Sequence, residues 1–296
     1  MSATASNPPR TWTVREVVAW TTDDLKKRGV DSARIDAELI VAHALRIDRI
    51  KILLSAEREL AAGELELVKS LLKRRRSFEP IAYLRGEREF YGHRFRVDAR
   101  VLVPRPDTET LVDVGLQRLR GRELGARVVD LCTGSGCVGV SLKLERPTLA
   151  LDATDLSPGA IAVARDNAHR LGAIWNVRFA VGDLFAPLGA PRPVHDLVVA
   201  NPPYIASDEI PTLQPDIKDH EPRLALDGGA DGLDLVRRIV LATPAWLRPG
   251  GALAMEVGAG QADAVRTLLV AAGFDDVRAS RDYGGIDRVV SGVRRG

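Results

Sequence analysis

Two different spacings of apolar residues divide the chain. From Thr13 to about Lys73 the apolar residues recur at helical spacing, which predicts a small helical bundle. From Arg127 onward, short runs of apolar and β-branched residues alternate with helical stretches. Strands that alternate with helices pair in parallel. The sequence therefore predicts an α/β fold with a doubly wound, Rossmann-like sheet of seven strands behind an N-terminal helical bundle.

The predicted helices of the bundle begin at Thr13, near Ser32 and near Glu64. Thr13 caps the first helix, with Glu16 three residues later at the capping-box position. The apolar face predicted for the second helix consists of Ile35, Leu39, Ile40 and Leu45. The third helix ends in a basic run at 73–76, and these charges suit the negative end of a helix dipole better than a nucleic-acid site.

Aromatic and charged residues around Gly92 predict a β-hairpin between the two patterns. We therefore expect a helical substrate-recognition domain over residues 1–76, a hairpin linker over 77–100 and the α/β domain over 101–296. Residues 1–11 are small and polar and are expected to be disordered.

The α/β domain is expected to contain strands over 127–131, 149–155, 177–181, 195–200, 252–257, 277–281 and 288–293. Helices are expected over 106–120, 137–144, 157–171, 232–247 and 261–272. A stretch at 205–231 contains three prolines and is long enough to be a functional loop.

Composition indicates an ordinary globular protein. The 296 residues are 45% hydrophobic and 28% charged, with a formal net charge of +2. Two cysteines, Cys132 and Cys137, are too few for a disulfide scaffold and lack the second pair of a zinc site, so no metal is expected. No secretory signal or apolar run of membrane-spanning length is visible, which favours a cytoplasmic protein.

A rigid turn follows the strand predicted at 195–200. This Asn-Pro-Pro-Tyr turn consists of Asn201, Pro202, Pro203 and Tyr204. It stands at the carboxyl end of a strand, where open α/β sheets bind ligands. The Asn201 side-chain oxygen and the Pro202 carbonyl are acceptors that can take both hydrogens of one planar –NH2 group, and Tyr204 can stack on its face. The turn favours a neutral amide or amino substrate.

A second turn follows the strand predicted at 127–131. This glycine turn consists of Cys132, Thr133, Gly134, Ser135 and Gly136. Glycines allow a cofactor to approach the backbone, and the following helix N-terminus favours a negative group. Asp155 stands where an acid binds a ribose diol, and Asp183 follows the next strand. NAD and S-adenosylmethionine both carry such a diol, so this pattern alone leaves both open.

Beyond the two turns, the sequence resembles the class I S-adenosylmethionine methyltransferases. It is similar in particular to the bacterial protein-(glutamine-N5) methyltransferases of peptide release factors. The similar segments are 36–45, 80–86, 90–110, 220–226 and the Asn-Pro-Pro-Tyr turn, so the resemblance spans nearly the whole chain. The chain departs from that family's usual pattern at Cys132, where Gly is usual, and at Asp107, where Glu is usual.

The resemblance implies S-adenosylmethionine as the cofactor and the glutamine of the Gly-Gly-Gln loop of class 1 release factors as the substrate. The glycine turn would then line the methionine part of the cofactor. Asp155 would hold the ribose hydroxyls, and Asp183 with Leu184 would flank the adenine.

In the same way, the resemblance implies that Asn201 lies between cofactor and substrate. With Pro202, Pro203 and Tyr204 it would hold the target glutamine, which makes Asn201, Pro202 and Tyr204 the catalytic candidates. Weaker candidates in a segment near the site are Arg105, Thr108 and Glu109.

The mechanism expected on this basis is an in-line attack of the glutamine amide nitrogen on the sulfonium methyl group, with S-adenosylhomocysteine leaving. An amide nitrogen is a poor nucleophile, and hydrogen bonds from it to two acceptors would draw charge onto it and fix its direction. Its proton becomes acidic only after methylation, so no base is needed before attack. The protein contributes mainly through positioning.

Other functions remain open at this point. The glycine turn also resembles that of the enzyme that methylates a glutamine of a large-subunit ribosomal protein. DNA adenine-N6 methyltransferases share the Asn-Pro-Pro-Tyr turn, but the near-neutral charge and small helical domain fit them less well. A non-enzymatic RNA-binding module could use the basic run at 73–76, and an NAD-dependent oxidoreductase would need a proton-handling pair near the turns. We expect a monomer that binds release factors, without membrane or direct DNA binding.

Overall fold

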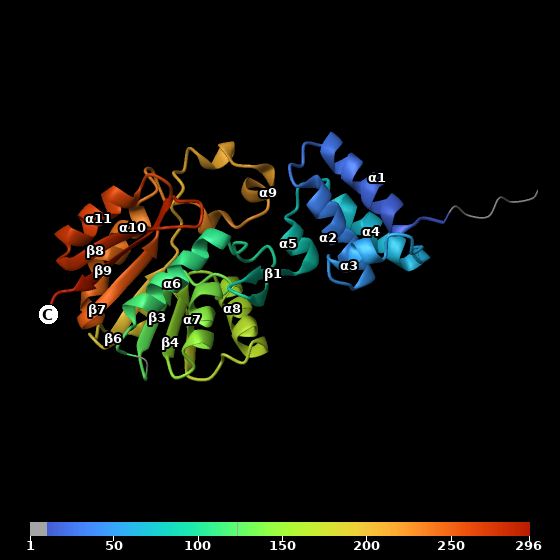
Figure 1. Cartoon of the computed structure of the whole chain (residues 1–296). Helices are drawn as coiled ribbons and strands as arrows, with labels where there is room; N and C mark the ends of the chain where they lie inside the picture. Colours follow the sequence, from blue (N-terminus) through green and yellow to red (C-terminus); the bar gives the residue numbers. More distant parts are fainter. Residues whose placement is uncertain (1–10, 123) are drawn as a thin grey trace, which may run out of the picture. The chain divides into compact units, whose positions relative to one another are not determined.

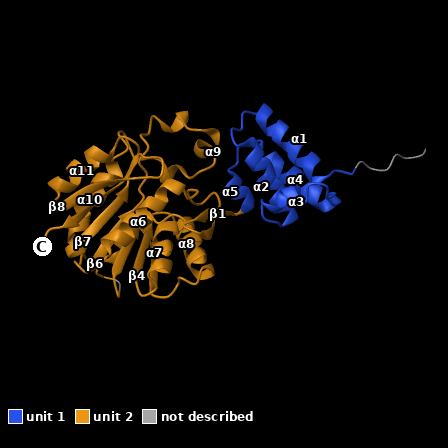
Figure 2. Ribbon diagram, viewed as in Figure 1, with its two compact units in different colours: residues 1–85 blue, residues 86–296 orange. Residues whose placement is uncertain are grey.

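The computed structural model describes residues 11–122 and 124–296, which form two compact units (Figures 1 and 2). The helical unit ends at Arg85, and the sheet unit runs from Gly86 to Gly296. This division differs from the predicted 1–76, 77–100 and 101–296. Leu84 packs in the core of the bundle, whereas Phe90 and Phe95 of the hairpin pack in the core of the sheet unit. The disorder predicted for residues 1–11 concerns residues that, apart from Thr11, lie outside the described range.

The described part of the helical unit contains five α-helices. They are α1 (Val14–Lys27), α2 (Ala33–Leu45), α3 (Lys51–Leu54), α4 (Ala62–Arg75) and α5 (Ile81–Arg85). The predicted capping box is confirmed, since the Glu16 amide donates to Thr13 Oγ1 over 3.3 Å and the Thr13 amide donates to Glu16 Oε2 over 3.0 Å. Helices α3 and α5 are too short to show a helical period in the sequence.

One predicted core residue of α2 is wrong. Ile35 is 46% exposed, because the buried face of the helix passes through Ala33, Ala37, Ile40 and Val41 instead. That face also contains Asp36, which the pattern of apolar residues could not indicate. The carboxylate of Asp36 accepts a hydrogen bond from Arg75 over 2.7 Å, and this partner makes its burial tolerable.

The sheet unit contains a hairpin and a seven-stranded sheet within the described residues. The hairpin strands are β1 (Glu87–Phe90) and β2 (His93–Arg96). The sheet strands are β3 (Arg127–Leu131), β4 (Ala150–Asp155), β5 (Val177–Val181), β6 (His195–Ala200), β7 (Leu247–Glu256), β8 (Phe274–Arg281) and β9 (Asp287–Arg294). Their order is β5-β4-β3-β6-β7-β9-β8, and β9 is antiparallel to both of its neighbours. The predicted doubly wound, mostly parallel sheet is confirmed.

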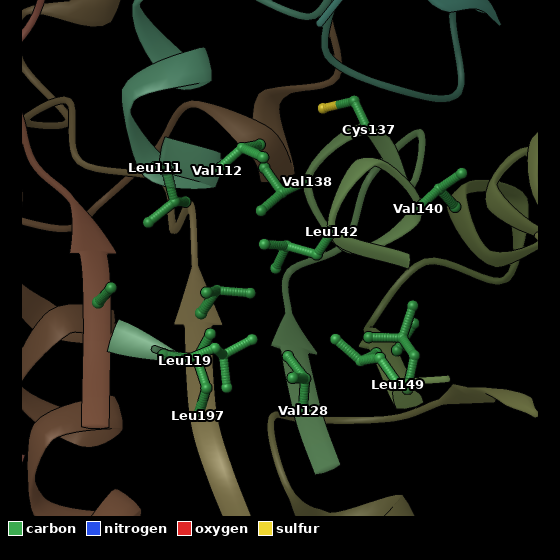
Figure 3. Close-up of a cluster of buried hydrophobic side chains, with 14 of the residues drawn as sticks. Leu111, Val112, Leu119, Val128, Cys137, Val138, Val140, Leu142, Leu149 and Leu197 are labelled. Carbon is green, nitrogen blue, oxygen red and sulfur yellow. The ribbon is translucent and has the colours of Figure 1, made fainter. Parts of the chain in front are cut away.

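Helices cover both faces of this sheet (Figure 1). The longer ones are α6 (Glu109–Arg118), α7 (Cys137–Glu145), α8 (Pro158–Arg170), α10 (Asp234–Ala242) and α11 (Ala262–Ala271). Alternate residues of each strand face opposite cores, as the pleat requires. Val128 and Leu197 pack with α6 and α7 in one core (Figure 3), whereas Val129 and Val198 pack with α10 and α11 in the other.

The helix predicted over 232–247 is too long. Helix α10 ends at Ala242, a 3₁₀ turn spans Thr243–Ala245, and Leu247 already belongs to β7. Pro244 lacks an N–H and its ring disfavours a continuing helix. The predicted loop at 205–231 is also partly ordered. It contains the 3₁₀ turns Ile210–Thr212 and Arg223–Ala225 and the short helix α9 (Pro215–Lys218). None of the described helices is long and apolar enough to cross a bilayer.

Candidate active site

The parallel strands of the sheet end in one row. Laterally paired residues near these ends are Thr154 of β4, Leu131 of β3, Ala200 of β6 and Met255 of β7. The residues that directly follow them are Asp155, Cys132, Asn201 and Glu256. The row crosses the point between β3 and β6 where the strand order reverses, which is where ligands bind in open α/β sheets. Strand register therefore brings together residues from four separate segments.

A cavity of about 690 Å³ adjoins this row, a size typical of small-molecule sites. All residues that line it belong to the sheet unit. The predicted site residues in its wall are Cys132, Thr133, Gly134, Ser135, Asp155, Asp183, Leu184, Asn201 and Pro203. Gly136, Pro202 and Tyr204 do not line it. The roles assigned to all of these residues from the sequence stay predictions.

The glycine turn is held by a buried acid from its own strand. Asp130 Oδ2 accepts a hydrogen bond from the Thr133 hydroxyl over 2.6 Å and another from the Gly139 amide over 3.1 Å. Burial raises the pKa of Asp130 to about 7, although both hydrogen bonds oppose the rise. Asp130 thus ties the beginning of the turn to the helix that follows it.

Three residues of the glycine turn, Cys132, Gly134 and Gly136, have left-handed backbone. Gly136 has φ +81°, and a Cβ built there would lie 3.1 Å from Ala164 Cβ, so glycine is required on both counts. Cys132 has φ +56° although it carries a side chain, which costs roughly 1–2 kcal/mol. A glycine at this position would adopt the same conformation without that cost.

Two further acids stand at the cavity. Asp155 Oδ2 accepts from the Gly134 amide over 2.9 Å and Oδ1 accepts from the Ser157 amide over 2.8 Å, which links the glycine turn to β4. Burial raises the pKa of Asp155 against these hydrogen bonds. Asp183 is half-exposed and forms an ion pair with Arg238 of α10. A carboxylate has about four lone-pair sites, so Asp155 keeps acceptor capacity for hydroxyl groups.

These features fit S-adenosylmethionine. The acidic groups suit a cationic sulfonium and a ribose diol, and the apolar part of the wall suits a purine ring. There is also room for a ligand beside the backbone of Gly134, because a Cβ built there would meet no atom closer than 3.9 Å.

The Asn-Pro-Pro-Tyr turn is held from elsewhere in the chain. Asn201 Nδ2 donates to Thr108 Oγ1 over 3.4 Å, and the Tyr204 hydroxyl donates to Glu256 Oε1 over 3.2 Å. Gln261 Nε2 donates to the Tyr204 carbonyl over 2.9 Å. Among the described residues, neither Asn201 Oδ1 nor the Pro202 carbonyl accepts a hydrogen bond. Both predicted acceptors for an –NH2 group are therefore without a hydrogen-bond partner there, although Pro202 is buried and does not line the cavity.

The three weaker candidates have partners that the sequence did not indicate. Arg105 donates from Nη2 to both carboxylate oxygens of Glu221 over 2.8 Å, across 116 residues. Burial raises the pKa of Glu221 to about 7 against the effect of Arg105. Glu109 accepts a hydrogen bond from the Tyr91 amide over 2.8 Å. Thr108 is buried and contacts Asn201 directly.

Sequence reasoning missed Asp130 and Glu256 as parts of the site. Both are acids at the end of an otherwise apolar strand, which is the signal that could have found them. Glu256 is 1% exposed, and burial raises its pKa to about 7 despite hydrogen bonding with Thr108 and Tyr204.

The basic run at 73–76 does not form a free cationic patch. Arg75 is buried against Asp36, Arg76 donates two hydrogen bonds of 2.8 Å to Asp24, and Arg74 pairs with Glu79. The prediction of cations at a helix end is confirmed, but three of the four cations have acidic partners within the helical unit, and only Lys73 is exposed without an acidic partner among the described residues.

Comparisons with known proteins agree with the geometry. The PrmC N-terminal domain model matches residues 16–86, and the methyltransferase small domain model matches residues 108–218. The release factor glutamine methyltransferase of Geobacter sulfurreducens is 43% identical over 284 residues, covering 96% of this chain and 98% of that protein. That of Cereibacter sphaeroides is 43% identical over 267 residues, covering 90% and 93%.

A solved methyltransferase structure from Pyrococcus furiosus shares the fold of the sheet unit. The two superpose with a TM-score of 0.51 at 16% identity, over 70% of this chain and 91% of that one. At such low identity, this likeness concerns the fold alone. The sequence identity with the two release factor glutamine methyltransferases, and the share of the chain over which it extends, are decisive instead. The chain belongs to the family of release factor glutamine methyltransferases, which are S-adenosylmethionine-dependent enzymes.

Proposed function

We propose that the protein transfers a methyl group from S-adenosylmethionine to the side-chain amide nitrogen of a glutamine, and that this glutamine belongs to the Gly-Gly-Gln loop of class 1 peptide chain release factors. Family membership supports the reaction and the substrate class. The observation that carries the proposal is the end-of-strand row, in which Asn201 stands directly beside the glycine turn, with its Oδ1 and the Pro202 carbonyl available as acceptors.

In this proposal the residues of the site bind the cofactor and the glutamine and orient them toward each other. Bound S-adenosylmethionine supplies an electrophilic methyl group. Asn201 Oδ1 and the Pro202 carbonyl accept the two hydrogens of the glutamine amide, which fixes the nitrogen and directs its lone pair. Thr108 holds the other side of the Asn201 amide, so the oxygen faces the substrate. Correct orientation of two reactants supplies up to roughly 7–11 kcal/mol of the barrier reduction.

Asp155 and the glycine turn hold the cofactor in the same proposal. Asp155 already fixes the Gly134 amide, and its remaining lone pairs accept from the ribose hydroxyls. Asp183 and Leu184 flank the adenine, and both line the cavity. Cys132 has no base role, because burial raises the pKa of its thiol.

The test is a methylation assay with labelled S-adenosylmethionine. A release factor, the same factor with the glutamine of its Gly-Gly-Gln loop replaced by alanine, a large-subunit ribosomal protein and duplex DNA are each incubated with the enzyme. We expect label only on the unaltered release factor, and mass spectrometry should place it on that glutamine. Label on the ribosomal protein or on adenine instead would replace the substrate proposed here.

The helical unit is proposed to contact the release factor. It matches the PrmC N-terminal domain and exposes three large apolar side chains close in sequence, with Ile50, Leu53 and Leu54 exposed by 78%, 75% and 88%. Leu54→Ser should raise KM for the release factor about tenfold and leave KM for S-adenosylmethionine unchanged. An unchanged KM for the release factor would remove this surface from the interaction.

We also propose that the enzyme acts as a monomer in the cytoplasm. Light scattering after size exclusion should give the mass of a single chain, and a dimer mass would contradict it.

A further inference from the structure

Glu256 is the member of the end-of-strand row that the proposed reaction does not use. It is 1% exposed and does not line the cavity, and the proposed reaction gives it no contact with the substrate. Its carboxyl instead faces the back of the Asn-Pro-Pro-Tyr turn. The Tyr204 hydroxyl donates to Glu256 Oε1 over 3.2 Å, and hydrogen bonding from Thr108 lowers the pKa that burial raises.

Thr108 connects Glu256 to Asn201. Asn201 Nδ2 donates to Thr108 Oγ1 over 3.4 Å, and Thr108 is 1% exposed, so its hydroxyl has little freedom to turn elsewhere. A threonine hydroxyl that accepts from Asn201 has its own hydrogen left to donate. Glu256 Oε2 is a buried carboxyl oxygen without a hydrogen-bond partner among the described residues, and it is the acceptor that this hydroxyl would reach.

Strand register explains why one acid reaches both ends of the turn. Ala200 pairs with Met255, so Asn201 and Glu256 follow directly after neighbouring positions on β6 and β7. Ala254 packs in the core formed with α6 and α7, and Glu256 lies two residues later on the same face of the strand. Thr108 directly precedes α6 on that face.

We propose that Glu256 is a positioning residue for the methyl transfer: through Thr108 and Tyr204 it fixes the Asn-Pro-Pro-Tyr turn, so that Asn201 Oδ1 and the Pro202 carbonyl face the glutamine amide. This inference rests on the proposed function. An apolar residue of similar size would fill the space but would leave the Thr108 and Tyr204 hydroxyls without an acceptor. The Tyr204 hydroxyl thereby gains a role besides the stacking that the sequence predicts for its ring.

The test compares Glu256→Leu, Glu256→Gln and wild type in the release factor assay. Glu256→Leu should lower kcat about 10- to 100-fold, because small displacements of a positioning group are costly in rate. Its Kd for S-adenosylhomocysteine should stay within about threefold, since the glycine turn is intact. Glu256→Gln keeps an oxygen acceptor for Tyr204 and should recover kcat to within about fivefold of wild type.

A matched control separates positioning from general stability. Asp196 is also a buried acid, 2% exposed, but it lies at the opposite end of β6, where it accepts from Arg122 and from the Arg127 amide. Asp196→Asn should lower Tm and leave kcat of the folded enzyme unchanged. Should Glu256→Leu fail to fold, Thr108→Val, which removes only the connecting hydroxyl, should lower kcat to a similar degree.

The outcomes are distinguishable. If wild type does not methylate the release factor, the proposed function fails and the inference with it. If wild type is active and folded Glu256→Leu, or Thr108→Val in its place, keeps the wild-type kcat, only the inference is overturned. Adding Tyr204→Phe to Glu256→Leu should cost less than the sum of the two single losses, because both variants remove the same hydrogen bond.

Discussion

The glycine turn and the Asn-Pro-Pro-Tyr turn meet at the cavity from neighbouring strands, but they are stabilised in different ways. The glycine turn is held by groups that are close to it in sequence. Asp130 precedes it, Asp155 accepts from the Gly134 amide over 21 positions, and Asn167 Nδ2 donates to the Ser135 carbonyl over 32 positions. The Asn-Pro-Pro-Tyr turn is held by Thr108 before α6 and by Glu256 at the end of β7, both far away in sequence.

Because the two turns are held in different ways, substitutions in them should have different effects. Contacts between elements that are near in sequence preorganise the cofactor side of the cavity, whereas the substrate side depends on the packing of elements that are far apart in sequence. Substitutions at the glycine turn should therefore alter cofactor affinity and stability. Substitutions at the Asn-Pro-Pro-Tyr turn should alter turnover while leaving cofactor affinity nearly intact.

The sharpest test of the substrate side is Asn201→Ala. It removes one of the two proposed acceptors, and kcat should fall at least about 100-fold, the usual effect of losing one preorganised hydrogen-bonding group at a reacting centre. Cofactor affinity should change by less than about threefold, because the acids that hold the glycine turn are untouched. Kinetics with a saturating release factor and calorimetry with S-adenosylhomocysteine measure the two quantities. A large loss of affinity would break the comparison.

The corresponding test of the cofactor side is Asp155→Ala. It removes a charged acceptor and also releases the Gly134 amide, so Kd for S-adenosylhomocysteine should rise roughly 10- to 100-fold. At saturating cofactor, kcat should fall much less. Asp152→Ala is a matched control on the same strand, since Asp152 pairs with His195 and does not line the cavity. Its Kd should equal that of wild type, and an equal loss in both variants would remove Asp155 from the cofactor site.

A smaller effect is expected from Gly136→Ala. The left-handed backbone and the contact with Ala164 together should cost about 2 kcal/mol of unfolding free energy, which corresponds to a drop in Tm of roughly 4–8 °C. Thermal unfolding followed by circular dichroism measures it. Gly134→Ala, where a built Cβ has open space but φ is +55°, should cost about half as much. Equal losses would mean that backbone strain alone matters at this turn.

The same contrast between local and distant contacts explains what the sequence could predict. The limits of β3, β5 and β6 match the prediction, because glycine, proline or a polar turn closes each of these apolar runs. Helix α3 has only four residues, which is too few for a period to appear. The ion pair of Arg105 with Glu221 spans 116 residues and depends on how the 205–231 segment folds back. Nothing near either residue in the sequence indicates it.

The candidate site follows the same rule. Asn201, Asp155 and the glycine turn lie where single turns with known chemistry mark them. The exclusion of Pro202 and Tyr204 from the cavity wall depends on the orientation of side chains within the turn, and no sequence pattern specifies that. An acid at the end of an apolar strand could mark Glu256 in the sequence, but its place beside Asn201 follows only from strand ends aligned in register, which requires the strand order as well as the strands.

The smallest effect tests whether Asp130 holds the glycine turn as a neutral acid. Burial raises its pKa to about 7, well above the value of about 3.9 in an unfolded chain. Between about pH 4 and pH 7 the folded state then binds more protons than the unfolded state, so the free energy of unfolding decreases as pH rises through this window. The stabilising contribution is complete below about pH 4 and lost above about pH 7.

Asp130→Asn should remove this part of the pH dependence without removing the contacts. Both hydrogen bonds of Asp130 end on Oδ2, and an amide oxygen in that place can accept them equally well. Relative to wild type, the variant should gain roughly 1 kcal/mol of unfolding free energy when both are compared at about pH 7 instead of about pH 6. Urea unfolding at the two pH values measures the difference. A variant whose stability follows that of wild type at both would mean that Asp130 is ionised in the fold, and the glycine turn would then be held by a charge rather than by a neutral group.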